Sequence, residues 1–260
     1  MTASARMKAL FDLHGRVAVV TGASAGIGRA MAGALADAGA SVILVARRKA
    51  ELASAAAEIR QCDGEAFAVA ADLSVRDELS EVAERCRQQA GGPVEIVVNA
   101  AGINLREPVG DISAASWDRT IDLNLAVPFF FTREFIADMR SQEYGRIINI
   151  ASLQSSRAFP NGLAYGASKG GVCQLTRAMA EAWSRHGIMC NAIAPGFFPT
   201  ALTEPVFSNP EIESRVAGQT AVGRNGRLED LCGSTVFFAS DASNYITGQT
   251  LYIDGGFTAK

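Results

Sequence analysis

The chain has 260 residues, of which 48% are hydrophobic and 20% charged, with a net charge of −3. This is an ordinary globular composition, and its acidic balance argues against nucleic acid as a partner, because phosphate-binding surfaces are usually basic. No apolar run approaches the roughly 18 residues that span a bilayer, and residues 1–13 lack the apolar core of a secretory signal. The sequence therefore predicts a cytoplasmic protein with neither a nucleic acid nor a membrane as partner.

The cysteines and histidines argue against two further classes of protein, those held together by disulfides and those that bind a metal. The five cysteines are scattered without a CxxC pair, and the two histidines, His14 and His186, have no neighbours at metal-ligand spacing. A disulfide framework is therefore not expected, and no metal site is predicted.

Short apolar runs alternate with helical patterns along the chain. Strands are predicted at 16–21, 41–46, 66–70, 95–98, 146–150, 189–194 and 250–253, and helices at 27–38, 49–60, 75–89, 113–139, 163–185 and 228–239. Apolar runs without alternation indicate strands that are covered on both faces. We therefore expect residues 1–260 to form a single α/β domain, a Rossmann-type, doubly wound parallel sheet of about seven strands with helices on both faces. Residues 197–226, rich in proline and glycine without a strand, are predicted to be a substrate lid.

A glycine-rich turn follows the first predicted strand and opens a helix. Glycines there let the backbone approach a pyrophosphate, and the helix N-terminus offers N–H groups and a positive dipole end. The residues predicted to bind a dinucleotide here are Gly22, Ser24, Ala25, Gly26, Ile27 and Gly28.

The second predicted strand ends in Ala46-Arg47-Arg48. An NAD-binding protein would carry an acidic residue here for the ribose hydroxyls, whereas a guanidinium binds a 2′-phosphate. The two arginines predict NADP(H) rather than NAD(H), with Arg47 as the main contact of the 2′-phosphate and Arg48 assisting. A solvated basic pair at a helix start is the alternative.

Tyr165 and Lys169 are four residues apart in a predicted helix, so both side chains lie on one face. A free tyrosine has a pKa of about 10, too high for efficient acid/base work at neutral pH. A nearby cation in a dry pocket lowers that pKa, so the spacing predicts an acid/base Tyr165 assisted by Lys169.

These motifs together resemble the short-chain dehydrogenase/reductase family over residues 13–260. The glycine spacing Gly22, Gly26, Gly28 is followed in the family's order by Asp72, Asn99-Ala100-Ala101-Gly102, Ser152, Tyr165 with Lys169, and Pro195-Gly196. The resemblance implies an oxidoreductase that moves a hydride between a nicotinamide and a small ketone or alcohol, assembled as a homotetramer or homodimer.

The resemblance also assigns individual residues. It implies Asn124, Ser152, Tyr165 and Lys169 as the catalytic set, with Lys169 also on the nicotinamide ribose. It further implies cofactor contacts from Asp72, Leu73, Asn99, Ala100, Gly102, Pro195, Gly196, Phe198 and Thr200, with Asp72 at the adenine and Asn99 steadying the central strands. Taken alone, Asp72 fits a helix cap, Ser152 a loop cap and Asn124 a buried backbone contact.

Three segments, residues 10–13, 148–155 and 191–198, look most like gluconate 5-dehydrogenases, which interconvert gluconate and 5-ketogluconate with NADP(H). Ser156, Phe159 and Phe197 stand where that pattern usually has glutamate, arginine and tyrosine. We therefore expect a more apolar substrate pocket beside the catalytic Ser152, lined by Phe159, Phe197 and Phe198, with Asn104 and Gln154 as polar contacts.

Several functions stay open at this stage. Arg157 fits either a shifted carboxylate contact or an ordinary surface arginine. The substrate is predicted to be a sugar acid, a small cyclic or hydrophobic ketone, or a 3-oxoacyl thioester. A non-enzymatic NADP(H) sensor is the alternative from another class, and it would tend to lose the catalytic residues that this chain keeps.

Overall fold

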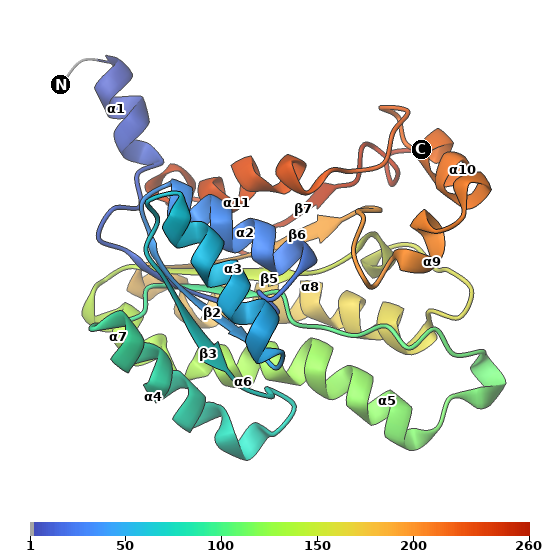
Figure 1. Cartoon of the computed structure of the whole chain (residues 1–260), viewed down its shortest axis with the longest axis horizontal. Coiled ribbons are helices and arrows are strands. Elements are labelled where there is room, and N and C mark those ends of the chain that lie inside the picture. Colours follow the sequence, from blue (N-terminus) through green and yellow to red (C-terminus); the bar gives the residue numbers. More distant parts are fainter. Residues whose placement is uncertain (1–2) are drawn as a thin grey trace.

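The structure, a computed structural model, describes residues 3–260 and contains one seven-stranded parallel sheet in the order β3-β2-β1-β4-β5-β6-β7 (Figure 1). The strands are β1 (Val17–Thr21), β2 (Ser41–Ala46), β3 (Ala66–Ala70), β4 (Ile96–Asn99), β5 (Gly145–Ile150), β6 (Ile188–Pro195) and β7 (Thr250–Ile253). Every neighbouring pair is parallel, which confirms the predicted α/β sheet. The strand order reverses between β1 and β4, the place where open α/β sheets form a ligand crevice.

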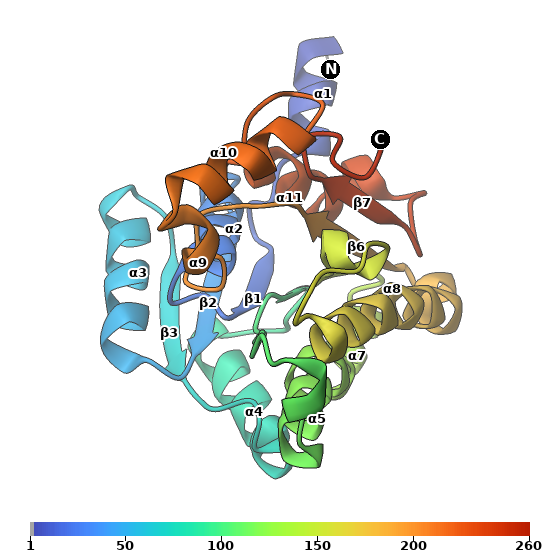
Figure 2. The ribbon, with the colours of Figure 1, turned by 90° about the vertical axis from the view of Figure 1, so that its right-hand side faces the viewer.

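Helices cover both faces of the sheet (Figures 1 and 2). The α-helices are α1 (Ala3–Leu10), α2 (Gly26–Asp37), α3 (Lys49–Gln61), α4 (Leu79–Ala90), α5 (Ala114–Ile121), α6 (Val127–Arg133), α7 (Ile136–Ser141), α8 (Leu163–Trp183), α9 (Glu204–Phe207), α10 (Pro210–Gln219) and α11 (Cys232–Ala239). Short 3₁₀ turns are η1 (Arg76–Glu78), η2 (Val109–Asp111), η4 (Leu153–Ser155), η5 (Ser184–His186), η6 (Leu228–Leu231) and η7 (Asp241–Ser243), and η3 (Asp122–Ala126) is a π-helical turn.

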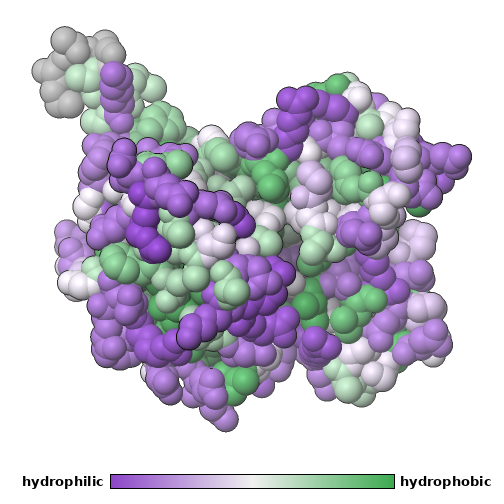
Figure 3. Space-filling view, in the orientation of Figure 1, coloured by the Kyte–Doolittle hydropathy of each residue, from purple (hydrophilic) through white to green (hydrophobic). Residues whose placement is uncertain are grey.

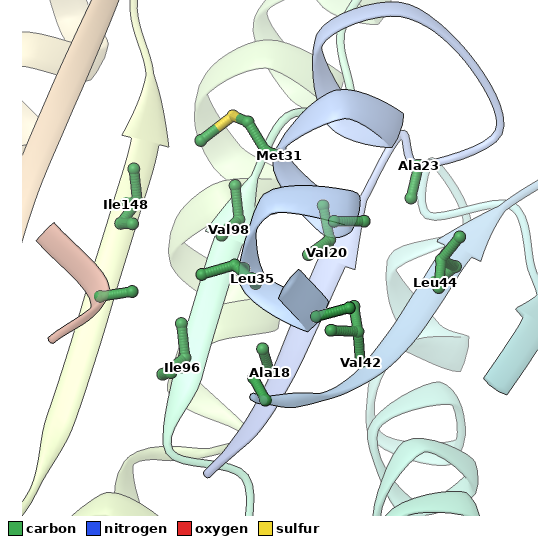
Figure 4. Close-up of a cluster of buried hydrophobic side chains, with 14 of the residues drawn as sticks. Ala18, Val20, Ala23, Met31, Leu35, Val42, Leu44, Ile96, Val98 and Ile148 are labelled. Atoms are coloured by element: carbon green, nitrogen blue, oxygen red, sulfur yellow. The ribbon is translucent and has the colours of Figure 1, made fainter. Parts of the chain in front are cut away.

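The two faces have separate apolar cores. On one face α2, α3 and α11 pack on alternate side chains of β1, β2 and β4, and Figure 4 shows Met31 and Leu35 of α2 over Val20 and Val98. On the other face α4, α6 and α8 cover the intervening strand residues. Because Leu35 is fully buried, its replacement by alanine would cost about 2 to 5 kcal/mol.

The long helix predicted at 113–139 is wrong as a continuous element. It begins at the Ser113 cap as expected, but passes through the π-helical η3 and ends as α6 and α7. Pro128 stands in the first turn of α6 and has no N–H to continue the regular α-helical ladder from α5. The break fixes the position of Asn124 within η3.

The N-terminal segment and residues 197–226 contain helices that the sequence did not predict. Residues 3–10 form α1, which projects away from the body in Figures 1 and 3. The 197–226 segment contains α9 and α10, which lie on the same side of the molecule as the loop before α5. Within residues 3–260, no helix is long and apolar enough to cross a bilayer, no cluster of potential metal ligands occurs, and the five cysteines are free.

Candidate active site

A cleft of about 850 Å³ lies at the carboxyl ends of the strands and extends beneath α9 and α10. On the face shown in Figure 3, the hydrophilic surface is interrupted by a hollow with hydrophobic residues at its rim. Almost every residue predicted from the sequence lines the cleft: Gly22, Ser24, Ala25, Gly26, Ile27, Gly28, Arg47, Arg48, Asp72, Leu73, Ala100, Gly102, Asn104, Ser152, Gln154, Phe159, Tyr165, Lys169, Pro195, Gly196, Phe197, Phe198 and Thr200. The two that do not line it are Asn99 and Asn124.

The glycine-rich turn is held against the loop after β4. A Cβ on Gly22, whose φ is +66°, would lie 2.9 Å from the Ala100 carbonyl oxygen, and one on Gly28 would lie 2.6 Å from the Gly22 oxygen. Thr21 Oγ1 accepts the N–H groups of Ala100 and Ala101 at 3.0 and 3.1 Å, which ties β1 to the loop after β4. Only glycine therefore fits this close approach.

The N-terminus of α2 opens into the same cleft. Its capping residue, Ala25, has no side-chain acceptor, so no cap hydrogen bond satisfies the first N–H groups of the helix. These donors and the positive end of the helix dipole suit an anion such as a phosphate.

Basic side chains mark the far end of the cleft beside β2 and β3. Arg48 Nη2 donates to Ser24 Oγ at 3.1 Å, while Arg47 Nη1 lies 3.7 Å from a carboxylate oxygen of Asp72. Asp72 also accepts hydrogen bonds from the Ser74 N–H and hydroxyl, so it closes a local turn and is not the cap of a helix. Arg48 Nη1 lies 3.5 Å from a carboxylate oxygen of Glu51, and both arginine side chains remain more than half exposed.

Asn99 and Asn124 lie below the cleft surface and hold its walls. Asn99 Nδ2 donates to Asn149 Oδ1 at 2.8 Å and to Thr132 Oγ1 at 2.9 Å, joining β4 to β5 and α6. Asn124 donates to the Ile103 carbonyl and accepts the Ile103 N–H, each at 2.9 Å. The two amides fix the central strands and the loop that carries Gly102.

Ser152 combines the two roles that its sequence context left open. It caps η4, accepting the Gln154 N–H at 3.1 Å, and it also hydrogen-bonds the Tyr165 hydroxyl. Burial raises the pKa of Tyr165 above its ordinary 10, while the Ser152 hydrogen bond and the positive charge of Arg106 act to lower that pKa. The Tyr165 phenol is therefore protonated at neutral pH.

Lys169 lies one helical turn after Tyr165 and is 4% exposed. Its ammonium group donates to the Ile150 carbonyl at 2.6 Å and lies 5.7 Å from the centre of the Tyr165 ring. Burial lowers the pKa of Lys169 from 10.5 to about 8. The two residues share one helix face as predicted, but the pKa of Tyr165 is raised and not lowered, because burial outweighs the Ser152 hydrogen bond and the charge of Arg106.

Arg106 is a cleft residue that sequence reasoning missed. It adopts a left-handed φ of +54°, and its Nη2 donates to the Leu202 carbonyl in the 197–226 segment at 2.9 Å. It lines the cleft and is close enough to Tyr165 to lower its pKa. No motif surrounds Arg106 in the sequence, and only its position after the Asn99–Gly102 motif could have drawn attention to it.

The remaining end of the cleft is aromatic on one wall. Phe159 and Phe197 pack edge to face, with ring centres 5.9 Å apart. The Oε1 of Gln154 is buried there without a hydrogen-bond partner in the described residues. Arg157 points elsewhere, because its Nη2 donates to the main-chain oxygen of Lys260 at 2.8 Å, so the proposed carboxylate contact from Arg157 is absent.

Comparisons with known proteins agree with this geometry. Residues 22–258 match a family model described as enoyl-(acyl carrier protein) reductase. The chain is 37% identical to the gluconate 5-dehydrogenase of Gluconobacter oxydans (strain 621H), an alignment that covers 96% of this chain and 98% of that protein.

Two solved structures superpose over nearly the whole chain. A gluconate 5-dehydrogenase from Burkholderia cenocepacia J2315, in complex with NADP and tartrate, is 33% identical with a TM-score of 0.93, covering 98% of this chain and 99% of that one. A 3-oxoacyl (acyl-carrier-protein) reductase from Agrobacterium tumefaciens C58 with NADP bound is 30% identical with a TM-score of 0.90, covering 97% and 98%. The chain belongs to the short-chain dehydrogenase/reductase family and is an oxidoreductase that acts on alcohol and carbonyl groups.

Proposed function

We propose that this protein is an NADP(H)-dependent oxidoreductase that interconverts a small ketone and a secondary alcohol, with Tyr165 as its acid/base. The observation that carries the proposal is the meeting of Ser152, Tyr165 and Lys169 in one cleft with the glycine-rich turn. A non-enzymatic sensor has no need for this set, so the enzymatic alternative is preferred.

The residues divide the proton chemistry among themselves. In the reducing direction the Ser152 hydroxyl donates to the substrate carbonyl, and the Tyr165 phenol gives its proton to the developing alkoxide. When bound, the nicotinamide supplies or accepts the hydride. Because the pKa of Tyr165 lies above 10, the phenol holds its proton at neutral pH and the resting site is prepared for reduction, while the charge of Arg106 stabilises the tyrosinate that remains. Asn124 contributes by holding the loop that carries Gly102 beside Lys169.

The cleft fits a dinucleotide phosphate along its length. The uncapped N-terminus of α2 suits the pyrophosphate, and the exposed Arg47 and Arg48 suit a 2′-phosphate. NADP-bound relatives support the choice of NADP(H) over NAD(H). Asp72, Leu73, Pro195, Gly196, Phe198 and Thr200 line the same cleft as further cofactor contacts.

We infer that the substrate carries an anionic group, as a sugar acid does. Arg106 reaches across the cleft towards Leu202 and is near Tyr165, where a carboxylate of a hydroxy acid would find a charged partner. Gln154 and Asn104 line the same cleft and add polar side chains to it. The names of the gluconate 5-dehydrogenase relatives, one of them bound to tartrate, support this class.

A small cyclic or hydrophobic ketone is the second candidate. The edge-to-face pair of Phe159 and Phe197 favours it, since these rings offer a substrate no hydrogen bond on that wall. The two candidate substrates differ in charge, so replacement of Arg106 should affect the sugar acid and not the uncharged ketone.

The test compares initial rates of NADPH oxidation with 5-ketogluconate, cyclohexanone and a 3-oxoacyl thioester, for the wild type and Arg106→Ala. The sugar-acid proposal expects turnover of 5-ketogluconate and a loss of about 10- to 100-fold in its kcat/KM in the variant, the worth of a charge-assisted hydrogen bond. If cyclohexanone alone is turned over, and at the same rate in Arg106→Ala as in the wild type, the second candidate replaces the first. Turnover of the thioester alone would overturn both.

Four expectations complete the proposal. Residues 1–260 act as a single domain whose 197–226 segment is the substrate lid, and the chain assembles as a homotetramer or homodimer in the cytoplasm. Arg106 bonds to Leu202 in that segment, and Thr200 lies against Gly26, so the lid contacts both ends of the cleft.

A further inference from the structure

A third phenylalanine lies behind the aromatic wall of the cleft. Phe257, in the segment after β7, is 6% exposed and packs 6.1 Å from Phe159 and 5.8 Å from Phe197 between ring centres. Phe159 follows η4, and Phe197 follows β6. Phe257 is not among the residues that line the cleft, so the ring of Phe257 supports the other two from behind.

The same cluster includes the two helices of the 197–226 segment. Val206 of α9 and Val216 of α10 are buried with Leu153 and Phe257, and these four form a small apolar core separate from the two faces of the sheet. Phe257 therefore joins the wall that faces the substrate to the helices above it.

Hydrogen bonds fix the segment that carries Phe257. Asp254 accepts the N–H groups of Gly256 and Thr258, each at 2.9 Å, and closes the turn. The Gly255 carbonyl accepts the Ala221 N–H at 2.7 Å, at the end of the 197–226 segment. Residues 254–260 are thus attached to the C-terminal side of α10.

Arg157 attaches these residues to the other side of the cleft. Its guanidinium donates to the main-chain oxygen of Lys260 at 2.8 Å, and Lys260 Nζ donates to the Thr220 carbonyl at 3.0 Å. We call these two hydrogen bonds, from Arg157 to Lys260 and from Lys260 to Thr220, the brace. Arg157 stands two residues before Phe159, so the brace connects the loop of Phe159 with the end of α10.

We propose that Phe257 is a positioning residue that sets substrate specificity, because it holds Phe159 and Phe197 as an apolar wall and couples that wall to α9 and α10. The inference rests on the proposed function and narrows its substrate class. A hydroxyl facing this wall would lose its water partners without replacement, which costs about five- to a hundredfold in affinity. The substrate therefore presents a ring or alkyl face to Phe159 and Phe197 and its polar end to Arg106.

The first test uses Phe257→Leu, which keeps an apolar side chain but removes the ring. We expect the KM of the ketone that the wild type reduces best to rise about 3- to 10-fold, the worth of the lost aromatic contacts, with kcat changed less than about twofold and NADPH affinity unchanged. The matched control is Phe237→Leu on α11, where the ring packs on Phe11 and Phe238 away from the cleft. A KM shift no larger than that of the control would overturn the proposal.

The second test does not depend on turnover. Arg157→Gln breaks the brace without touching the aromatic rings, and amide hydrogen exchange is measured over residues 204–219 in this variant, in Phe257→Leu and in Phe237→Leu. Faster exchange in the first two alone supports the coupling, and equal exchange in all three overturns it. If the wild type reduces no ketone, the proposed function fails while the exchange data still decide the role of Phe257.

Discussion

At the scale of single residues, Lys169 shows how burial changes the chemistry of a side chain. The ammonium group is 4% exposed and keeps one main-chain partner, Ile150. Its charged form is therefore disfavoured in the folded protein, and the pKa falls from 10.5 to about 8. Burial also raises the pKa of Tyr165 above 10, so the pKa values of the two residues have moved apart.

The lowered pKa of Lys169 predicts a pH-dependent cost to stability. Below about pH 8 both folded and unfolded chains hold the proton, and the folded state carries the full cost of about 3 kcal/mol. Between about pH 8 and 10.5 the folded protein releases the proton first, so the cost shrinks as pH rises. We expect the stability advantage of Lys169→Met over the wild type to fall by about 2 to 3 kcal/mol between about pH 7 and pH 10.

Denaturant unfolding at both pH values measures this difference. Lys49→Met, at an exposed position that begins α3, is the control and should show no such trend. A Lys169→Met difference that is constant with pH would mean that the buried ammonium group is not desolvated as described.

The two arginines after β2 predict the cofactor preference. Arg47→Ala and Arg48→Ala should each raise the Kd of NADPH about 10- to 100-fold while leaving the Kd of NADH nearly unchanged, since only the former has a 2′-phosphate. Fluorescence titration measures both constants. Arg177→Ala, exposed on α8 and outside the cleft, should change neither, and a variant that weakens NADH equally would contradict the assignment.

At the scale of elements, the start of α2 is the most constrained part of the site. In Gly28→Ala the new Cβ would lie 2.6 Å from the Gly22 oxygen and 3.0 Å from the Thr21 oxygen, both backbone atoms that cannot move aside. We expect this variant to lose about 1 to 3 kcal/mol of stability and most of its NADPH affinity. Gly33→Ala in the same helix meets no atom within 4 Å and should gain about 0.5 to 1 kcal/mol. Thermal unfolding and NADPH titration check both, and similar behaviour of the two variants would contradict the close packing of the turn.

Local patterns predicted the elements and motifs that depend on neighbouring residues. The apolar runs of the seven strands, the glycine turn and the four-residue spacing of Tyr165 and Lys169 are all encoded within short stretches of sequence. The fold class and most cleft residues followed from these patterns and from the family resemblance.

Features that depend on distant segments were not predictable in the same way. The π-helical η3 depends on how Pro128 and Asn124 meet the rest of the fold, and the guanidinium of Arg106 is held by the carbonyl of Leu202, 96 residues away. The sequence around Arg157 does not reveal its role, because its partner, Lys260, lies 103 residues further along the chain. Sequence periodicity carries no information about such pairings.

At the scale of the whole molecule, the cleft joins the sheet to the 197–226 segment, so cofactor binding should stabilise the entire fold. At a concentration about 100 times its Kd, NADPH should add about 2.7 kcal/mol to the free energy of unfolding. Thermal unfolding with increasing NADPH should show a progressive rise in Tm, with a smaller rise for NADH at equal concentration. A Tm that is indifferent to NADPH would contradict the assignment of the cleft.

The central claim is that Tyr165 performs the proton transfer in this cleft, and one comparison tests it most directly. The wild type and Tyr165→Phe are assayed for NADPH oxidation with the best ketone substrate, and their NADPH affinities are measured in parallel. We expect turnover to fall about 10²- to 10⁴-fold with the Kd of NADPH unchanged within about twofold, because only the acidic hydroxyl is removed. A variant that binds NADPH normally and keeps a tenth or more of the wild-type rate would contradict the account.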